Sequence, residues 1–181
     1  MNFVVVDLEA TCWQQNPEAD NEIIEIGAVL IDAHGQPKGE FQRFVRPILA
    51  PKLSDFCKKL TSIRQEEVEN APFFWEVLPA FQNWIASFGQ DYVLCSWGFY
   101  DKKQFEKDCI LHHQNTDWLS PHISIKHQYA KIKGLPRAIG MSKALDLEGF
   151  TLEGTHHRGI DDARNIAKIF VKYLDKFNFS E

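Results

Sequence analysis

The sequence has no long apolar run. The longest uninterrupted stretches, such as Phe3–Val6 and Ala28–Ile31, are far shorter than the roughly 20 residues that a membrane helix requires. Asp7 interrupts the first stretch before the hydrophobic region of a signal peptide can form. We therefore expect neither a membrane span nor secretion, and a cytoplasmic location.

Cysteine and positive charge are also scarce. The four cysteines lie far apart with no C-x-x-C pair, which favours reduced thiols over a disulfide framework or a zinc cluster. The formal net charge of −5 argues against binding nucleic acid by bulk charge alone. It does not exclude a metal-dependent enzyme acting on nucleic acid, because bound cations change the local charge.

Repeats, low-complexity segments and Gly/Ser linkers are absent as well. A chain of 181 residues, 44% of them apolar, suits one domain with its own core, so we expect a single domain over residues 1–181.

The apolar pattern predicts a mixed α/β fold. Phe3–Val6, Glu22–Ile31 and Tyr92–Cys95 have the composition of strands, and Glu40–Val45 alternates as a hairpin partner of the second. Ser62 with Gln65 resembles a capping box that opens a short helix, and Pro72 suits the first turn of the next helix. Two further sets recur at helical spacing: Phe73, Val77, Phe81, Trp84, Ile85 and Phe88, and then Ala163, Ile166, Ala167, Phe170, Tyr173, Leu174 and Phe177. We expect one sheet with helices packed on it.

Two acids follow the first strand. Side chains two apart on a strand share a face, so Asp7 and Glu9 would converge. Two like charges held that close are unfavourable without a cation between them. A water-exposed strand end is the alternative. Glu22 and Glu25 are rival acids, but they flank an apolar run with no partner motif.

A second cluster, His156 to Asp162, precedes the last helix. Helical spacing places Asp162 in line with Ile166, Ile169 and Tyr173, beside the apolar stripe, and Asp161 in line with Asn165, Lys168 and Lys172 on the solvent face. Asp162 should therefore point toward the sheet, where a carboxylate needs a partner. An acid that only stabilises the helix start is the alternative, and it suits Asp161 better.

A third segment, Ser96 to Asp101, closes a strand and opens a helix. Gly98 permits an unusual turn there, and the inner face of the helix would include Phe105 and Cys109. An ordinary helix cap is the alternative interpretation. Together the three segments would bring four carboxylates to one place, which suits hard divalent cations. Two such ions about 4 Å apart stabilise both the attacking and the leaving oxygen in phosphate displacement, and a nearby histidine suits a general base.

These motifs resemble those of the DEDDh 3′–5′ exonucleases: DLEATCW with Asp7 and Glu9, SWGFYD ending at Asp101, and GTHHRGIDDARNIA with His157 five residues before Asp162. HHRGIDD, LTSI at Leu60–Ile63 and GMSKAL at Gly140–Leu145 are similar to the exoribonuclease branch that includes the histone-mRNA 3′ exonuclease and its bacterial relatives. The resemblance spans about Asn2 to Leu174.

The resemblance implies an RNase H-like mixed sheet, with three antiparallel N-terminal strands followed by parallel additions and with helices on both sides. It implies that Asp7, Glu9, Asp101 and Asp162 bind two Mg²⁺ or Mn²⁺ ions and that His157 takes a proton from the attacking water. The products would be nucleoside 5′-monophosphates, released from the 3′ end of single-stranded RNA or short overhangs. His156 would be a supporting residue. Implied substrate contacts are Ala10, Thr11, Thr61, Ile63 and Tyr100, the last standing where relatives often have Trp.

A basic window is the remaining candidate. No Asp or Glu occurs from Trp118 to Leu145. The window's cations are either possible phosphate contacts for a single strand or a solvated face: Lys126, Lys131, Lys133, Arg137 and Lys143.

Two other functions stay open. One is a catalytically silent module that binds nucleic acid or protein, against which the intact five-residue motif argues. The other is a DNA-directed 3′–5′ exonuclease, because selection of RNA depends on 2′-hydroxyl contacts that single residues do not reveal. Zinc hydrolysis is weaker, since His112, His113, His122 and His127 lack the usual ligand spacing.

Overall fold

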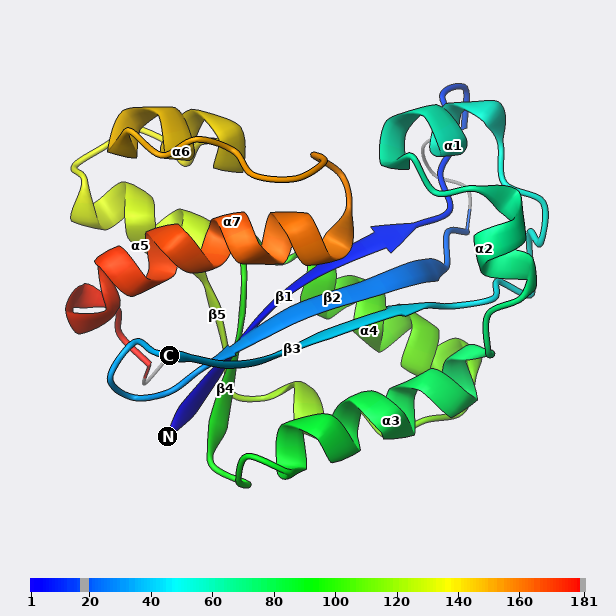
Figure 1. The fold of residues 1–181 in the computed structure, drawn as a ribbon, viewed down its shortest axis with the longest axis horizontal. Coiled ribbons are helices and arrows are strands. Elements are labelled where there is room, and N and C mark those ends of the chain that lie inside the picture. The colour runs from blue at the N-terminus through cyan, green and yellow to red at the C-terminus, as the bar shows by residue number, and fades with distance from the viewer. Residues whose placement is uncertain (17–19, 180–181) are drawn as a thin grey trace.

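The computed structural model describes residues 1–16 and 20–179 and contains one five-stranded mixed sheet (Figure 1). The spatial order of the strands is β3-β2-β1-β4-β5. Strand β1 (Asn2–Ala10) pairs antiparallel with β2 (Ile23–Ile31), which pairs antiparallel with β3 (Pro37–Phe44). Strands β4 (Tyr92–Ser96) and β5 (His122–Ser124) are added parallel on the other side of β1. The mixed sheet expected from the sequence is confirmed, and β5 is a strand that the periodicity did not predict.

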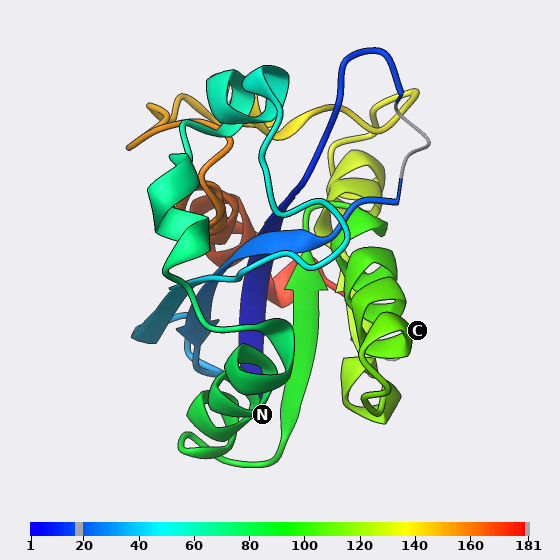
Figure 2. The ribbon, with the colours of Figure 1, turned by 90° about the vertical axis from the view of Figure 1, so that its right-hand side faces the viewer.

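Helices cover both faces of the sheet (Figure 2). One face packs against α5 (Ile125–Ile132), α6 (Met141–Glu148) and α7 (Gly159–Lys172), and the other packs against α3 (Phe74–Ala86) and α4 (Tyr100–Leu111). Two short helices, α1 (Asp55–Thr61) and α2 (Gln65–Glu69), lie beside the end of β1 (Figure 1). Short 3₁₀ turns cover Asp117–Leu119 and Leu174–Lys176.

The alternation of β1 decides which side chains reach the functional site. Phe3 and Val5 belong to the core under α5, α6 and α7, whereas Val4, Val6 and Leu8 belong to the core under α3 and α4. Asp7 and Glu9 continue the odd-numbered series. They therefore share the face that α7 covers, as the spacing of two predicts.

Several local predictions need correction. Ser62 does not open a helix: with φ of 60° it ends α1, and α2 begins after Arg64, whose backbone N–H donates to Glu67. Pro72 lies two residues before α3 rather than in its first turn. Helix α3 ends before Phe88, and α7 ends before Tyr173, although Tyr173 and Phe177 still pack on the core. Local patterns mark apolar faces well and element ends poorly.

Asn165 is the clearest departure on α7. The sequence pattern placed it on the solvent face, but it is fully buried. The segment before α7 folds back over this side of the helix, and the Asn165 amide binds the backbone N–H and C=O of Glu153. A buried amide with its hydrogen bonds satisfied is stable there. Among the described residues, no helix is both long and apolar enough to cross a membrane.

Candidate active site

The end of β1 brings the first two acids together. Asp7 is partly buried and Glu9 is 9% exposed. Ligand oxygens of Asp7, Glu9 and Asp162 all lie within 4.8 Å of one another. Three of the four carboxylates that the sequence predicts to converge therefore meet at one point, from a strand and a helix.

Asp162 reaches this point because α7 begins directly on the sheet. Its side chain is 6% exposed, whereas that of Asp161 is 20% exposed. Asp161 turns away: its oxygens accept from the Thr155 backbone N–H at 2.9 Å and from Arg164 at 3.0 Å. The inward direction predicted for Asp162 is confirmed, and Asp161 holds the preceding loop in place.

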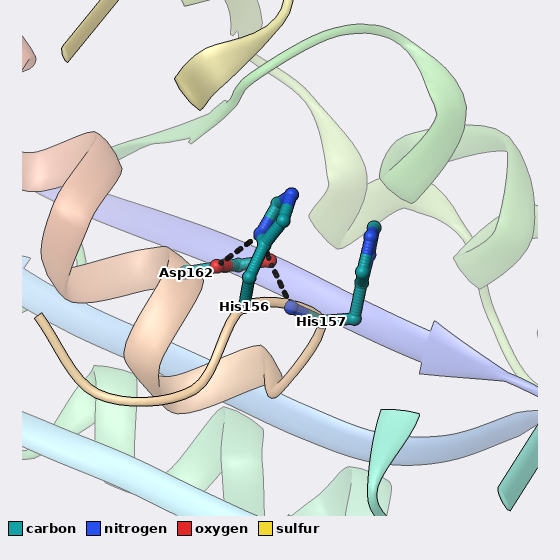
Figure 3. A group of neighbouring side chains, drawn as sticks. All are labelled: His156, His157 and Asp162. Carbon is teal, nitrogen blue, oxygen red and sulfur yellow. Dashed lines mark hydrogen bonds and ion pairs between the residues drawn. The ribbon is translucent and has the colours of Figure 1, made fainter. Parts of the chain in front are cut away.

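Two histidines surround Asp162 (Figure 3). His156 Nδ1 lies 3.0 and 3.1 Å from the two Asp162 oxygens, and since a carboxylate only accepts, Nδ1 carries the proton. The His157 backbone N–H donates to Asp162 Oδ2 at 2.9 Å, and the two imidazole rings stack with centroids 3.9 Å apart. His157 has φ of 64°, a left-handed conformation that is unfavourable for a residue with a side chain. Such an outlier, held by its own hydrogen bond, is typical of functional sites.

Asp101 enters from the first turn of α4. Its side chain is buried, and Oδ1 accepts the Leu8 backbone N–H at 3.0 Å, so α4 is anchored between the two acids of β1. Phe105 and Cys109 face inward on the same helix, as predicted. Gly98, however, keeps a φ outside the left-handed region, so the turn before α4 is not one that only glycine adopts.

The carboxylates raise one another's pKa values. Burial and then the charges of Asp101, Glu9 and Asp162 raise the pKa of Asp7 well above its usual range. Burial and then the charges of Asp162, Glu25 and Asp101 raise the pKa of Glu9 to about 9. Burial raises the pKa of Asp101 to about 6 despite the hydrogen bond from Leu8. A cluster of oxygen ligands whose negative charges repel is the environment that binds a hard divalent cation.

Sequence reasoning missed the role of Glu25. Its fully buried carboxylate accepts from Arg158 Nε at 3.1 Å and from the Gly159 N–H at 3.0 Å, so it ties the start of α7 to β2. Glu22, the other rival acid, accepts the N–H groups of Ile48, Leu49 and Ala50 and shapes a loop instead. The signal that was available for Glu25 was the arginine inside the HHRGIDD motif.

A cavity of about 430 Å³ lies over the acids. All five motif residues line it, and so do Trp97, Tyr100, Lys126 and His156. Trp97 also donates from its indole to the Ile139 carbonyl, so it serves both the core and the cavity. The cavity is open to one side of the molecule and offers room for a substrate beside the carboxylates.

The implied sugar contacts lie at the α1 end of the site. Thr11 is buried, and its hydroxyl accepts the Glu22 N–H, while the Ala10 carbonyl faces the Cys57 thiol. Thr61 donates to the Cys57 carbonyl, and Ile63 packs in the small core of Ile24, Leu53 and Val68. Tyr100 is 52% exposed, and its hydroxyl accepts from Asn21. Thr11 and Tyr100 line cavities, whereas Thr61 and Ile63 are buried and line neither of these cavities.

The structure does not bring the five basic residues to one place. Lys126 lines the cavity, and Lys131 lies one groove further along α5. Lys133 is held away from the site by Glu148 at 3.1 Å and the Tyr173 hydroxyl at 3.1 Å. Arg137 and Lys143 are exposed around the start of α6.

Comparison with known proteins agrees with this geometry. An exonuclease family model matches residues 4–170. The chain belongs to this exonuclease family. Membership implies divalent metal ions as cofactors, and the carboxylate oxygens of Asp7, Glu9 and Asp162 fit them.

Individual relatives cover nearly the whole chain. It is 34% identical to rat 3'-5' exoribonuclease 1 over 94% of this chain and 52% of that protein. It is 31% identical to the 3'-5' exonuclease eri1 of Schizosaccharomyces pombe over 94% of this chain and 67% of that protein. The chain thus spans about half the length of the mammalian 3'-5' exoribonuclease 1 proteins that it matches.

Solved structures share the fold. The rAMP-bound nuclease domain of 3'hExo, a DEDDh family member, superimposes with a TM-score of 0.90 at 32% identity and covers 96% of this chain and 92% of that one. Exonuclease I superimposes with a TM-score of 0.78 at 9% identity over 97% of this chain and 41% of that one, a likeness of fold alone. The RNase H-like fold expected from the motifs is confirmed.

Proposed function

We propose that this chain is a metal-dependent 3′–5′ exonuclease that releases nucleoside 5′-monophosphates from the 3′ ends of single-stranded RNA or short overhangs. The observation that carries the proposal is the meeting of Asp7, Glu9 and Asp162 within 4.8 Å, with Asp101 and His157 lining the same cavity. The preference for RNA rests on the relatives named as exoribonucleases.

The four carboxylates would hold two cations, Mg²⁺ or Mn²⁺. Bound divalent ions would supply the positive charge that stabilises both the entering and the leaving oxygen of an in-line phosphate displacement. The carboxylates supply only oxygen ligands. Hard cations such as Mg²⁺ and Mn²⁺ prefer oxygen ligands, whereas softer metals prefer sulfur or nitrogen.

His157 would act as the general base. Burial, and then the neighbouring His156, lower its pKa, so its imidazole is neutral at pH 7 and able to accept a proton from the attacking water. The Asp162 carboxylate accepts a hydrogen bond from the His157 backbone N–H and so fixes the backbone position from which the imidazole projects. His156 donates from Nδ1 to Asp162, and its ring stacks on that of His157. These contacts suit a positioning role rather than a second base.

The terminal nucleoside would lie toward α1. Ala10 and Thr11 would meet its sugar, Thr61 and Ile63 would line its pocket, and Tyr100 would stack on a base. The half-exposed ring of Tyr100 at the cavity edge supports stacking, since an exposed aromatic face suits any base. The basic residues Lys126, Lys131, Lys133, Arg137 and Lys143 would contact phosphates, with Lys126 in the most favourable place.

Two further parts of the proposal concern the chain as a whole. Residues 1–181 would act as a single exonuclease domain, in line with the family match over residues 4–170. The protein would work in the cytoplasm, in line with its four free cysteines.

A degradation ladder tests the proposal and its rivals. Matched RNA and DNA oligonucleotides, labelled at the 3′ or the 5′ end, are incubated with Mg²⁺, Mn²⁺ or a chelator. We expect the 3′ label to leave at once as a mononucleotide and the 5′-labelled chain to shorten stepwise, faster for RNA, and only with a cation. Faster loss of DNA would identify a DNA-directed enzyme. Binding without degradation under every cation would identify a silent module.

A further inference from the structure

A second groove runs beside the active-site cavity along α5. It has a volume of about 360 Å³ and is lined by Phe99, His122, Ser124, His127 and Lys131, among others. We call it the α5 groove. None of the residues assigned above to the terminal nucleoside lines it. Of the sequence motifs, only SWGFYD contributes to its lining, through Phe99.

An aromatic platform forms one wall of the α5 groove. Phe99 is 49% exposed, so its ring is accessible to a ligand. It stacks on His127 with centroids 5.0 Å apart and an interplanar angle of 29°. The His127 ring is fixed in turn by a 2.6 Å hydrogen bond between Nδ1 and the Ser124 hydroxyl. A fixed, exposed aromatic pair is the surface on which nucleic acid bases stack.

The charge of the groove suits a phosphate backbone. Lys131 lines it, and Lys126, five residues earlier on the same helix, lines the neighbouring cavity. In the part of the chain that the structure describes, neither lysine makes an ion pair, so both charges are available to a ligand. The stretch from Trp118 to Leu145, which supplies most of the groove, contains no Asp or Glu.

The groove borders the active-site cavity. Phe99 and Tyr100 are adjacent residues, and Phe99 lines the α5 groove while Tyr100 lines the cavity. Lys126 and His127 are also adjacent, and Lys126 lines the cavity while His127 lines the groove. The two hollows are also linked by a hydrogen bond, because the Ser124 hydroxyl of the groove donates to the carbonyl of Trp97, which lines the cavity, at 3.3 Å. Tyr100 lines the cavity and contacts Asn21, which borders the hollow next to Thr11, whereas its neighbour Phe99 lines the α5 groove.

We propose that the α5 groove binds the nucleotides upstream of the scissile phosphodiester, with a base stacked on the Phe99–His127 pair and phosphates beside Lys126 and Lys131. The inference rests on the proposed exonuclease function and assigns the path of its single-stranded substrate. Stacking accepts every base, so the groove adds affinity without sequence preference. A substrate long enough to fill the groove should therefore bind more tightly than one that ends at the cavity.

Binding of a fluorescent octaribonucleotide tests this assignment without hydrolysis. The full chain is titrated in chelator, at several salt concentrations, and fluorescence anisotropy is measured. We expect Phe99→Ala to raise the Kd about fivefold or more, the usual effect of losing one stacked base. Lys131→Gln should flatten the slope of log affinity against log salt by roughly 0.7, one phosphate contact to a single strand.

Lys38→Gln is the control for the loss of one lysine charge; unlike Lys131, Lys38 is paired with Asp32 at 3.3 Å. It removes the same charge from an exposed position on β3, the edge strand farthest from β5, and should leave the Kd unchanged. The melting temperature of each variant shows that it is folded. Unchanged affinity in both Phe99→Ala and Lys131→Gln, or an equal loss in Lys38→Gln, would overturn the assignment.

Hydrolysis separates this inference from the proposed function. With Mg²⁺, the loss of kcat/KM in Phe99→Ala should be larger for the octanucleotide than for a dinucleotide, which cannot reach along the groove. Equal losses on both would overturn the inference while leaving the exonuclease intact. No hydrolysis of either by the unmodified chain would refute the proposed function, and the binding experiment would still decide the groove.

Discussion

Gly27 of β2 and Gly159 of α7 pack backbone against backbone. A methyl group on Gly27 would overlap the main chain of Gly159 and Ile160, and one on Gly159 would lie 2.9 Å from the Asp7 carbonyl. Asp7 is paired with Gly27 across the sheet, so this contact sets how closely α7 approaches β1. The distance between Asp162 and the acids of β1 depends on two residues that have no side chain.

Gly27→Ala should therefore disable the site from a distance. The added methyl must push α7 outward, and overpacking of this kind costs about 1–3 kcal/mol of unfolding free energy. We expect a lower melting temperature and a loss of divalent-cation binding, both measured by thermal denaturation with and without Mg²⁺. A variant that keeps its stability and its cation-induced stabilisation would show that the contact does not position α7.

Asp162→Asn and Asp161→Asn form a matched pair. We expect Asp162→Asn to abolish hydrolysis, because Asp162 supplies one of the three carboxylate oxygens that lie within 4.8 Å of one another. Asp161→Asn should retain most activity, because Asp161 bonds Thr155 and Arg164 outside the cavity. Initial rates on single-stranded RNA measure both. Equal loss in two folded variants would contradict the assignment.

Glu9→Gln should stabilise the cation-free protein. Because the pKa of Glu9 rises to about 9 in the folded chain, its ionisation opposes folding from pH 4.5 upward, where the unfolded chain has already lost the proton. The gain in melting temperature should be absent near pH 4 and grow toward pH 8. At saturating Mg²⁺ the parent should instead have the higher melting temperature, since only the unmodified site keeps all its carboxylates. A variant less stable than the parent at pH 8 in chelator would count against crowding of the acids.

His157→Ala should lose about 10²–10⁴-fold in turnover, the usual share of general-base catalysis, while still binding cation and RNA. The lowered pKa of His157 places the acidic limb of the parent's pH–rate profile below pH 6.5, with activity falling as the base becomes protonated. Single-turnover rates from pH 5 to 8 measure the limb. Near-normal turnover in the variant at saturating Mg²⁺ would exclude the role.

Glu148→Gln tests a buried network remote from the site. Burial alone would raise the pKa of Glu148, but Lys172, Tyr129, Tyr173 and Lys133 donate to it and hold its pKa at about 2. A lowered pKa stabilises the fold above pH 4.5, and the contribution disappears as the pH falls toward 2. We expect the variant to lose about 1–3 kcal/mol at pH 7, as for other hydrogen bonds to charged groups, and to show a weaker acid dependence below pH 4.5. Parallel urea titrations at pH 7 and pH 3 measure the difference.

Local sequence patterns predicted much of this site. A period of two placed Asp7 and Glu9 on one face of a strand, and helical phase turned Asp162 inward. These rules succeed because they describe the geometry of a single element. They failed where a neighbour intervened: Asn165 has the phase of a solvent-facing residue, yet the segment before α7 covers it.

By itself the sequence determined the fold class, the four carboxylates and the histidine beside them, because strand and helix periods are local and the motif intervals are specific. Only the tertiary structure decided how these groups meet. The Glu25–Arg158 pair, the contact of Gly27 with Gly159 and the groove beside Phe99 join residues far apart in the chain. No local period encodes such contacts, since they depend on how closely a helix can approach a sheet.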